Sequence, residues 1–204
     1  MSDYNLGFWD ERYSGEEYVY GTEANQFFKE QIQKIYPVEN ILLPGEGEGR
    51  NAVFAAKLGW DVDAFDQSYV AKVKAEKLAK LNNVKLNYSN VDITKFTPKK
   101  NFYACAAIIF VHLPANVRSE FYKKVIDSIK PNGKIIVELF SKNQMGKNSG
   151  GPQNLEMLST IDEIKHEFEL LKPIILKEEN IYLNEGDKHS GEASVIRFVG
   201  EKVS

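Results

Sequence analysis

Residues 39–51, ENILLPGEGEGRN, carry the strongest structural signal in the chain. A short apolar run (39–44) is followed directly by a glycine-rich turn, and a helical pattern then continues to about Leu58. Strand, glycine turn and helix in this order are typical of α/β sheets whose ligands bind beyond the carboxyl ends of the strands. Glycine lets the backbone approach a ligand closely, and the helix N-terminus offers free N–H groups. The stretch therefore predicts a ligand site.

The residues of this turn narrow the class of ligand. A dinucleotide fingerprint needs glycine where this chain has Arg50, and a P-loop needs a Lys-Ser/Thr pair that does not follow. Glu46 and Glu48 would also repel a pyrophosphate. The turn favours a cationic ligand without phosphate.

The pattern outside the turn alternates between strands and helices. Further strands are predicted at 61–65, 83–89, 103–113 and 134–140, with helices from Ser68 to about Leu81, from Pro114 to Pro131, and after a capping box at 160–163. The runs 173–183 and 193–203 predict a closing antiparallel hairpin around a polar loop (184–192). Strands alternating with helices predict an α/β, doubly wound parallel sheet.

The N-terminal segment, residues 1–30, is unusually aromatic. It contains Tyr4, Phe8, Trp9, Tyr13, Tyr18, Tyr20, Phe27 and Phe28. One interpretation is an amphipathic helix docked on the core. The other adds an aromatic lid over a ligand, because Trp and Tyr offer flat apolar faces with a polar tip. The two interpretations are compatible.

Composition sets the broad class. The chain has 204 residues, 43% hydrophobic and 27% charged, and a formal net charge of −3, which favours one domain over residues 1–204 and gives no electrostatic reason to expect nucleic acid. The single cysteine, Cys105, is assigned to the core, and no Cys/His cluster predicts a metal. We find no secretory signal and no run long enough to span a bilayer, so we expect a cytoplasmic protein, a monomer or weak homodimer.

Two aspartates follow predicted strands. Asp66, at the end of the second strand, is expected to accept hydrogen bonds from a ribose diol, and a helix N-terminal role is its alternative. Asp92, after the third strand, could receive an adenine amino group or could be a plain turn residue.

With these motifs the chain resembles class I S-adenosylmethionine-dependent methyltransferases of the tellurite-resistance and thiopurine type. Residues 8–13 (FWDERY) resemble the family's aromatic lid, 45–51 (GEGEGRN) its glycine loop and 66–68 (DQS) its ribose corner. The resemblance implies a Rossmann-like seven-stranded sheet of order 3-2-1-4-5-7-6, with strand 7 antiparallel and a helical N-terminal lid. It implies S-adenosylmethionine as cofactor, held by Trp9, Tyr13, Gly45, Glu46, Gly47, Arg50, Asn51, Asp66, Gln67, Ser68, Asp92, Ile93, Val111 and His112. Leu43 replaces a common family acid that holds the amino-acid end of the cofactor, a role that Glu46 could take.

The acceptor and the catalytic residues are less well specified. Methyl transfer needs a general base only if the acceptor is protonated, and His112 and His189 are the candidates because strand ends place both on the ligand rim. His166 is expected to be solvated. We expect the polar loops 141–154 and 184–192 to bound a small-molecule acceptor, and the absence of an added recognition domain, basic surface or membrane helix disfavours protein, RNA and lipid acceptors. The alternative is a non-catalytic cofactor- or partner-binding module with the same fold.

Overall fold

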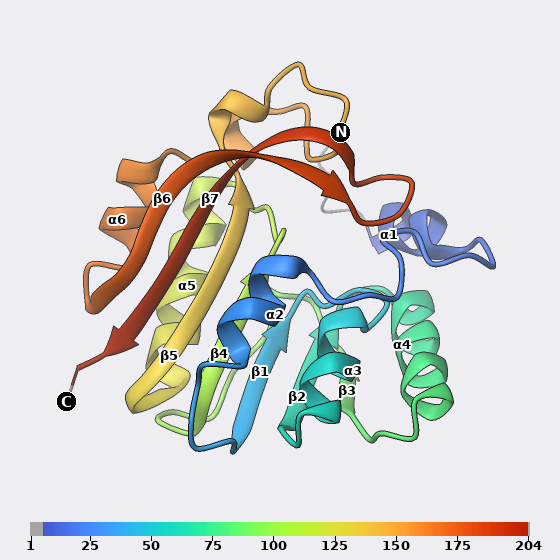
Figure 1. The fold of residues 1–204 in the computed structure, drawn as a ribbon, viewed down its shortest axis with the longest axis horizontal. Coiled ribbons are helices and arrows are strands. Elements are labelled where there is room, and N and C mark those ends of the chain that lie inside the picture. Colours follow the sequence, from blue (N-terminus) through green and yellow to red (C-terminus); the bar gives the residue numbers. More distant parts are fainter. Residues whose placement is uncertain (1–5, 204) are drawn as a thin grey trace.

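The computed structural model describes residues 6–203 and contains one seven-stranded sheet flanked by helices (Figure 1). Tyr4 of the aromatic segment lies outside the described residues. The strands are β1 (Asn40–Pro44), β2 (Asp61–Asp66), β3 (Asn87–Asn90), β4 (Tyr103–Ile109), β5 (Ile129–Phe140), β6 (Leu171–Asn184) and β7 (Ser190–Lys202). The helices are α1 (Leu6–Tyr13), α2 (Gln26–Ile32), α3 (Arg50–Lys57), α4 (Tyr69–Leu81), α5 (Ala115–Ser128) and α6 (Ile161–Glu167).

The strand order is β3-β2-β1-β4-β5-β7-β6, and β7 is antiparallel to β5 and β6. This confirms the expected fold class, strand order and closing hairpin. Because β1 to β5 are parallel, their carboxyl ends meet at one edge of the sheet. The β6–β7 hairpin curves over that edge toward α1 (Figure 1).

The central strands β1 and β4 are buried on both faces of the sheet, as in other α/β sheets. Ile41 and Leu43 of β1 pack with α2 and α3, whereas Leu42 packs with the α5 and α6 side. Cys105 is fully buried between these layers, which confirms its place in the core. The apolar run in β1 is therefore the centre of two hydrophobic layers, and it fixes the glycine turn at the ligand edge.

Several boundaries differ from the sequence-based expectation. The third strand, expected at 83–89, covers only Asn87–Asn90, because α4 ends at Leu81 and a turn with Asn83 in the left-handed region (φ 54°) follows. The fifth strand begins at Ile129 rather than 134, so α5 ends at Ser128 and the Pro-Asn-Gly sequence lies within the strand. The capping box at Thr160 and Glu163 forms as predicted.

No helix formed by the described residues is long and apolar enough to cross a membrane.

Candidate active site

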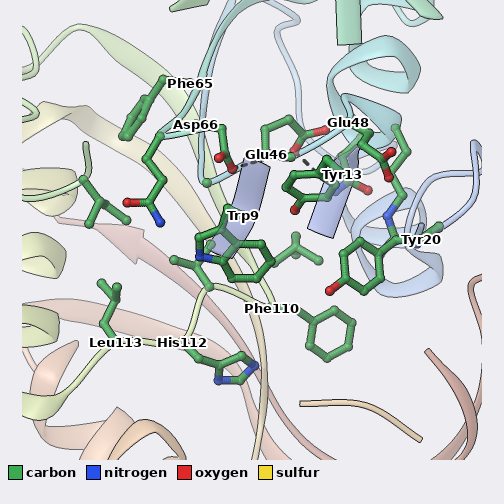
Figure 2. A pocket seen from close by; sticks show the side chains of 18 of the residues that line it. Trp9, Tyr13, Tyr20, Glu46, Glu48, Phe65, Asp66, Phe110, His112 and Leu113 are labelled. Atoms are coloured by element: carbon green, nitrogen blue, oxygen red, sulfur yellow. Dashed lines mark hydrogen bonds between the residues drawn. The ribbon is translucent and has the colours of Figure 1, made fainter. Parts of the chain in front are cut away.

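A pocket lies at the carboxyl ends of β1, β2 and β4, between the aromatic N-terminal segment and the β6–β7 turn (Figure 2). It is lined by twelve of the residues expected to bind a cofactor, namely Trp9, Tyr13, Gly45, Glu46, Gly47, Arg50, Asn51, Asp66, Gln67, Ile93, Val111 and His112. His189, the second histidine candidate, also lines it. The topology thus brings together residues from distant parts of the sequence in one cavity.

The glycine turn is held in a conformation that favours glycine. Gly45, Gly47 and Gly49 all have positive φ (61°, 62° and 88°), a region that side chains rarely adopt. The Gly47 N–H donates to Asp66 Oδ2 at 3.0 Å, and the Tyr88 hydroxyl donates to the Gly47 carbonyl at 2.6 Å. Both sides of this glycine are therefore fixed by side chains from the neighbouring strands β2 and β3.

Two carboxylates beside the glycine turn, those of Glu46 and Asp66, have pKa values raised above their usual range. Burial is the main cause, and it raises the pKa of Glu46 to about 7 and that of Asp66 to about 6. Hydrogen bonds oppose the effect: Glu46 Oε1 accepts from Ala52 N at 2.7 Å, and Asp66 Oδ1 accepts from Ser68 N at 2.8 Å. A buried carboxylate favours a cationic partner, and both groups lie where one could reach them.

Two of the expected cofactor contacts do not line the pocket. Ser68 is fully buried, and its hydroxyl accepts from Ala71 N as the cap of α4 and donates to Asp10 at 2.6 Å. Asp92 Oδ1 accepts from both the backbone N–H and the hydroxyl of Thr94, which is the pattern of a turn aspartate. Their neighbours Gln67, Val91 and Ile93 line the cavity instead. The side chains of Ser68 and Asp92 instead accept hydrogen bonds from the local backbone.

The N-terminal segment is anchored over the pocket by Lys74 of α4. The Lys74 ammonium donates to the carbonyls of Gly15 (2.9 Å) and Glu17 (2.6 Å) and pairs with Glu48 at 2.5 Å. Glu48 also accepts from Val19 N at 2.8 Å. Lys74 is thus the main attachment of the N-terminal segment.

We expect Lys74→Met to loosen this segment without unfolding the sheet, because the carbonyls of residues 15 and 17 and the Glu48 carboxylate lose their donor. Amide hydrogen exchange at residues 13–20 should become at least about tenfold faster, since each lost hydrogen bond to a charged donor contributes about 1.5–3 kcal/mol. Lys72→Met is the matched control, because Lys72 makes only an exposed ion pair with Glu76. Equal protection in both variants would show that Lys74 does not anchor the segment.

The two pocket histidines differ in environment. Burial lowers the pKa of His112 to about 3, and its Nε2 is buried without a hydrogen-bond partner. The pKa of His189 is also lowered by burial, but Glu185 opposes the shift, with its Oε2 3.6 Å from His189 Nδ1. His189 is therefore the better proton acceptor, and His112 stays neutral. His166 is solvated as predicted, with 80% of its side chain exposed.

Glu185 also connects the hairpin turn to the glycine loop. Its Oε2 pairs with the Arg50 guanidinium at 2.8 Å, and Arg50 Nη1 donates to the Tyr20 carbonyl at 3.1 Å. Gly186 fits closely against this segment, because a Cβ there would lie 2.6 Å from the Val19 carbonyl oxygen. The turn and the N-terminal segment form one wall of the pocket.

The expected role of the loop 141–154 is not supported by its position. None of its described residues lines the pocket. Gln144 is fully buried, donates to Ser149 at 2.9 Å and accepts from Ser194 N at 2.8 Å, while a Cβ at Gly150 would lie 2.6 Å from the His189 ring. The loop therefore packs behind His189 and supports the wall, because its buried amide and close glycine contacts tie it to β7.

Several lining residues were missed, including Tyr20, Phe65, Phe110, Leu113 and Met157. Phe110 follows β4 directly with φ of 54°, a strained conformation for a bulky residue. Its ring lies 4.6 Å from that of Phe140 and 4.6 Å from that of His189. The position of Phe110 directly after a parallel strand could have indicated that it lines the pocket. The sequence gives no such indication for Met157, because only the packing of a short 3₁₀ turn (Leu155–Met157) brings it to the pocket.

Comparisons with known proteins identify relatives of this fold. The model of the family described as tellurite resistance protein TehB matches residues 8–179. No curated protein matches the chain in sequence. The crystal structure of TehB from Haemophilus influenzae is similar, with 15% identity and a TM-score of 0.74 over 97% of this chain and 66% of that one. A SAM-dependent methyltransferase from Methanosarcina mazei has 15% identity and a TM-score of 0.70 over 89% of this chain and 99% of that one.

A third similar structure comes from work on the conversion of a disulfide bond into a thioacetal group during echinomycin biosynthesis. It has 14% identity and a TM-score of 0.74 over 97% of this chain and 92% of that one. At these identities the solved structures show the fold.

Proposed function

This chain belongs to the tellurite resistance protein TehB family of S-adenosylmethionine-dependent methyltransferases, and we propose that it methylates a small molecule bound in the pocket at the sheet edge. S-adenosylmethionine is the cosubstrate, and S-adenosylhomocysteine would be the product. The observation that carries the proposal is the pocket itself, in which the glycine turn, Asp66 and the aromatic segment face one cavity. Measuring S-adenosylhomocysteine formation with a panel of small acceptors tests it.

The lining residues fit this cosubstrate. Glu46 and Asp66 give one end of the pocket the negative charge that suits a sulfonium and an ammonium group and disfavours a phosphate, whereas the Glu48 carboxylate is already paired with Lys74. Phe65, Val91 and Ile93 supply apolar surface of the kind that an adenine ring needs. When bound, S-adenosylmethionine supplies an electrophilic methyl group. Glu46 would hold the ammonium group in place of the acid that Leu43 replaces, and Asp66 would hold the ribose.

The residues of the chain would position the reacting groups, exclude water from them and supply a base. Trp9 and Tyr13 stack with ring centroids 5.7 Å apart, and Tyr13 is buried over the glycine turn, so the segment would exclude water from the reacting groups. Glu185 faces Nδ1 of His189, which favours the proton on that nitrogen and makes Nε2, at the ring edge near Gly150, the nitrogen that would accept a proton. We assign His189 as the base and His112 as a neutral hydrogen-bonding group.

We expect Asp66→Ala to weaken cofactor binding at least about tenfold, because a hydrogen bond to a charged acceptor contributes about 1.5–3 kcal/mol. Isothermal titration calorimetry with S-adenosylhomocysteine gives the dissociation constant directly. Asp61→Ala is the control, since Asp61 lies at the opposite end of the same strand, is exposed and does not line the pocket. If Asp66→Ala binds as tightly as the control, the aspartate serves only the glycine turn and α4.

The raised pKa of Glu46 gives cofactor binding a pH dependence. With a pKa of about 7 in the folded chain, Glu46 is mostly protonated at pH 5 and ionised at pH 8. The ionised form attracts the ammonium group, so affinity should rise over this range, and binding at pH 7 should release a proton. Calorimetry in buffers of different ionisation enthalpy measures that release. Glu46→Gln should remove both effects, and a variant that keeps the wild-type pH profile would contradict the assignment.

The same pKa affects the stability of the free protein in the opposite direction. The folded-state pKa is above the ordinary value of 4.5, so between pH 4.5 and 7 the unfolded chain loses this proton first. Glu46 therefore lowers the free energy of unfolding as pH rises through this interval. Cofactor affinity and stability should thus respond to pH with opposite signs.

A further inference from the structure

The pocket has two chemically different ends. Asp66, Glu46 and Glu48 lie together at one end, and Phe110, His112 and Leu113 lie at the other, with the Trp9 indole between them (Figure 2). The first end suits the cosubstrate. The second end is the space left for the acceptor, and its lining is aromatic, aliphatic and imidazole.

Positive charge in this pocket is already neutralised. Within the described part of the chain, Arg50 is the one lysine or arginine that lines the cavity. Its guanidinium is paired with Glu185 at 2.8 Å, and its Nη1 donates to the Tyr20 carbonyl at 3.1 Å. Burial also keeps both imidazoles from acquiring charge readily. Away from the sulfonium of the cosubstrate, an anionic acceptor would therefore lose its hydration and find no unpaired lysine or arginine side chain among the described lining residues.

Two imidazole nitrogens at this end of the pocket are buried without a hydrogen-bond partner within residues 6–203, His112 Nε2 and His189 Nδ1, and the second faces Glu185 at 3.6 Å. His112 Nε2 is buried and makes no hydrogen bond among the described residues, which is costly unless a bound molecule pairs with it. Around it lie the rings of Phe110 and Phe140, with centroids 6.4 and 5.4 Å from that of His112. Nε2 of His112, together with Nε2 of His189, thus offers hydrogen-bond acceptors within an apolar and aromatic surface.

We propose that the acceptor is an uncharged molecule with an apolar or aromatic body and one protic nucleophile, and that molecules carrying a carboxylate on that body are excluded. This rests on the proposed function. The acceptor's lone pair forms the new bond to the methyl carbon, the carbon–sulfur electron pair stays on the sulfur of S-adenosylhomocysteine, and the acceptor's proton passes to Nε2 of His189. Charge is thus balanced without a metal or a redox partner.

Matched acceptor pairs test the proposal. Benzyl mercaptan is compared with 4-(mercaptomethyl)benzoate, and p-cresol with 4-hydroxyphenylacetate, so that each pair differs by one carboxylate. We expect an uncharged member to be methylated with kcat/KM at least about a hundredfold above its carboxylate, since a buried unpaired charge is strongly disfavoured.

A second experiment introduces a positive charge at the acceptor end of the pocket. Met157→Lys should raise the preference for the carboxylate member by at least about tenfold, whereas Met145→Lys, which is outside the pocket and partly exposed, should leave the preference unchanged. Equal turnover within a pair, or an unchanged preference in Met157→Lys, would overturn the proposal. So would the failure of both uncharged probes to react. Cosubstrate binding, measured by calorimetry on the same samples, shows separately whether the proposed function stands.

Discussion

Replacing Gly47 with valine is expected to abolish S-adenosylmethionine binding. The residue has φ of 62°, and a Cβ there would lie 2.8 Å from the Tyr13 hydroxyl oxygen, so a branched side chain must displace Tyr13 and distort the turn. The Asp66 and Tyr88 hydrogen bonds to the Gly47 backbone would be lost together. We expect affinity to fall by at least about a hundredfold, measured by calorimetry.

A control variant, Gly146→Val, separates the effect of backbone strain from the effect of filling the binding site. Gly146 also has positive φ (82°), but a Cβ there meets nothing within 4 Å and the residue does not line the pocket. Gly146→Val should therefore lose some stability and keep wild-type affinity. If Gly47→Val binds the cosubstrate as Gly146→Val does, the glycine turn is not part of the binding site.

Replacing His189 with alanine is expected to lower turnover by about 10²- to 10⁴-fold, the usual contribution of a general base, while cosubstrate affinity stays nearly unchanged. His189 is enclosed by Tyr20, Phe110 and Phe140, with ring centroids 4.5, 4.6 and 5.3 Å away. His166→Ala is the control, because that side chain is 80% exposed.

The pH profile distinguishes a base from a packing residue. Glu185 raises the pKa of His189 against the effect of burial, so Glu185→Gln should move the acidic limb of the turnover profile to lower pH. A His189→Ala variant with wild-type turnover, or a Glu185→Gln profile without this shift, would remove His189 from the mechanism.

Most of the architecture follows from local pattern. The glycine turn between an apolar strand and a helix predicts the ligand edge, and Ser68 and Thr160 mark helix starts that the structure confirms as side-chain caps. The β3 boundary was missed because Val84 and Leu86 alternate with polar residues as they would in a strand. The turn after α4 covers residues 82–83, and residues 84–86 form an irregular connection to β3.

The pocket was harder to predict because its walls depend on tertiary packing. Asp66 and the glycines follow a fixed spacing along consecutive elements and could be placed from sequence. Met157 and Tyr20 reach the cavity only through the fold of connecting segments, and the attachment of the N-terminal segment to Lys74 spans 57 to 61 positions. Ser68 shows a different limit of sequence reasoning. It was expected to contact the cofactor, but its hydroxyl caps α4 and the residue does not line the pocket.

Methyl transfer from S-adenosylmethionine to a small molecule is the central activity that we propose for this chain. It is tested most directly by incubating the protein with S-adenosylmethionine carrying a trideuterated methyl group and a small-metabolite extract, followed by mass spectrometry. We predict that S-adenosylhomocysteine accumulates in step with one metabolite that gains the labelled methyl, and that His189→Ala suppresses both. Binding of S-adenosylmethionine with neither product formed above a protein-free control would contradict this activity and indicate a binding module instead.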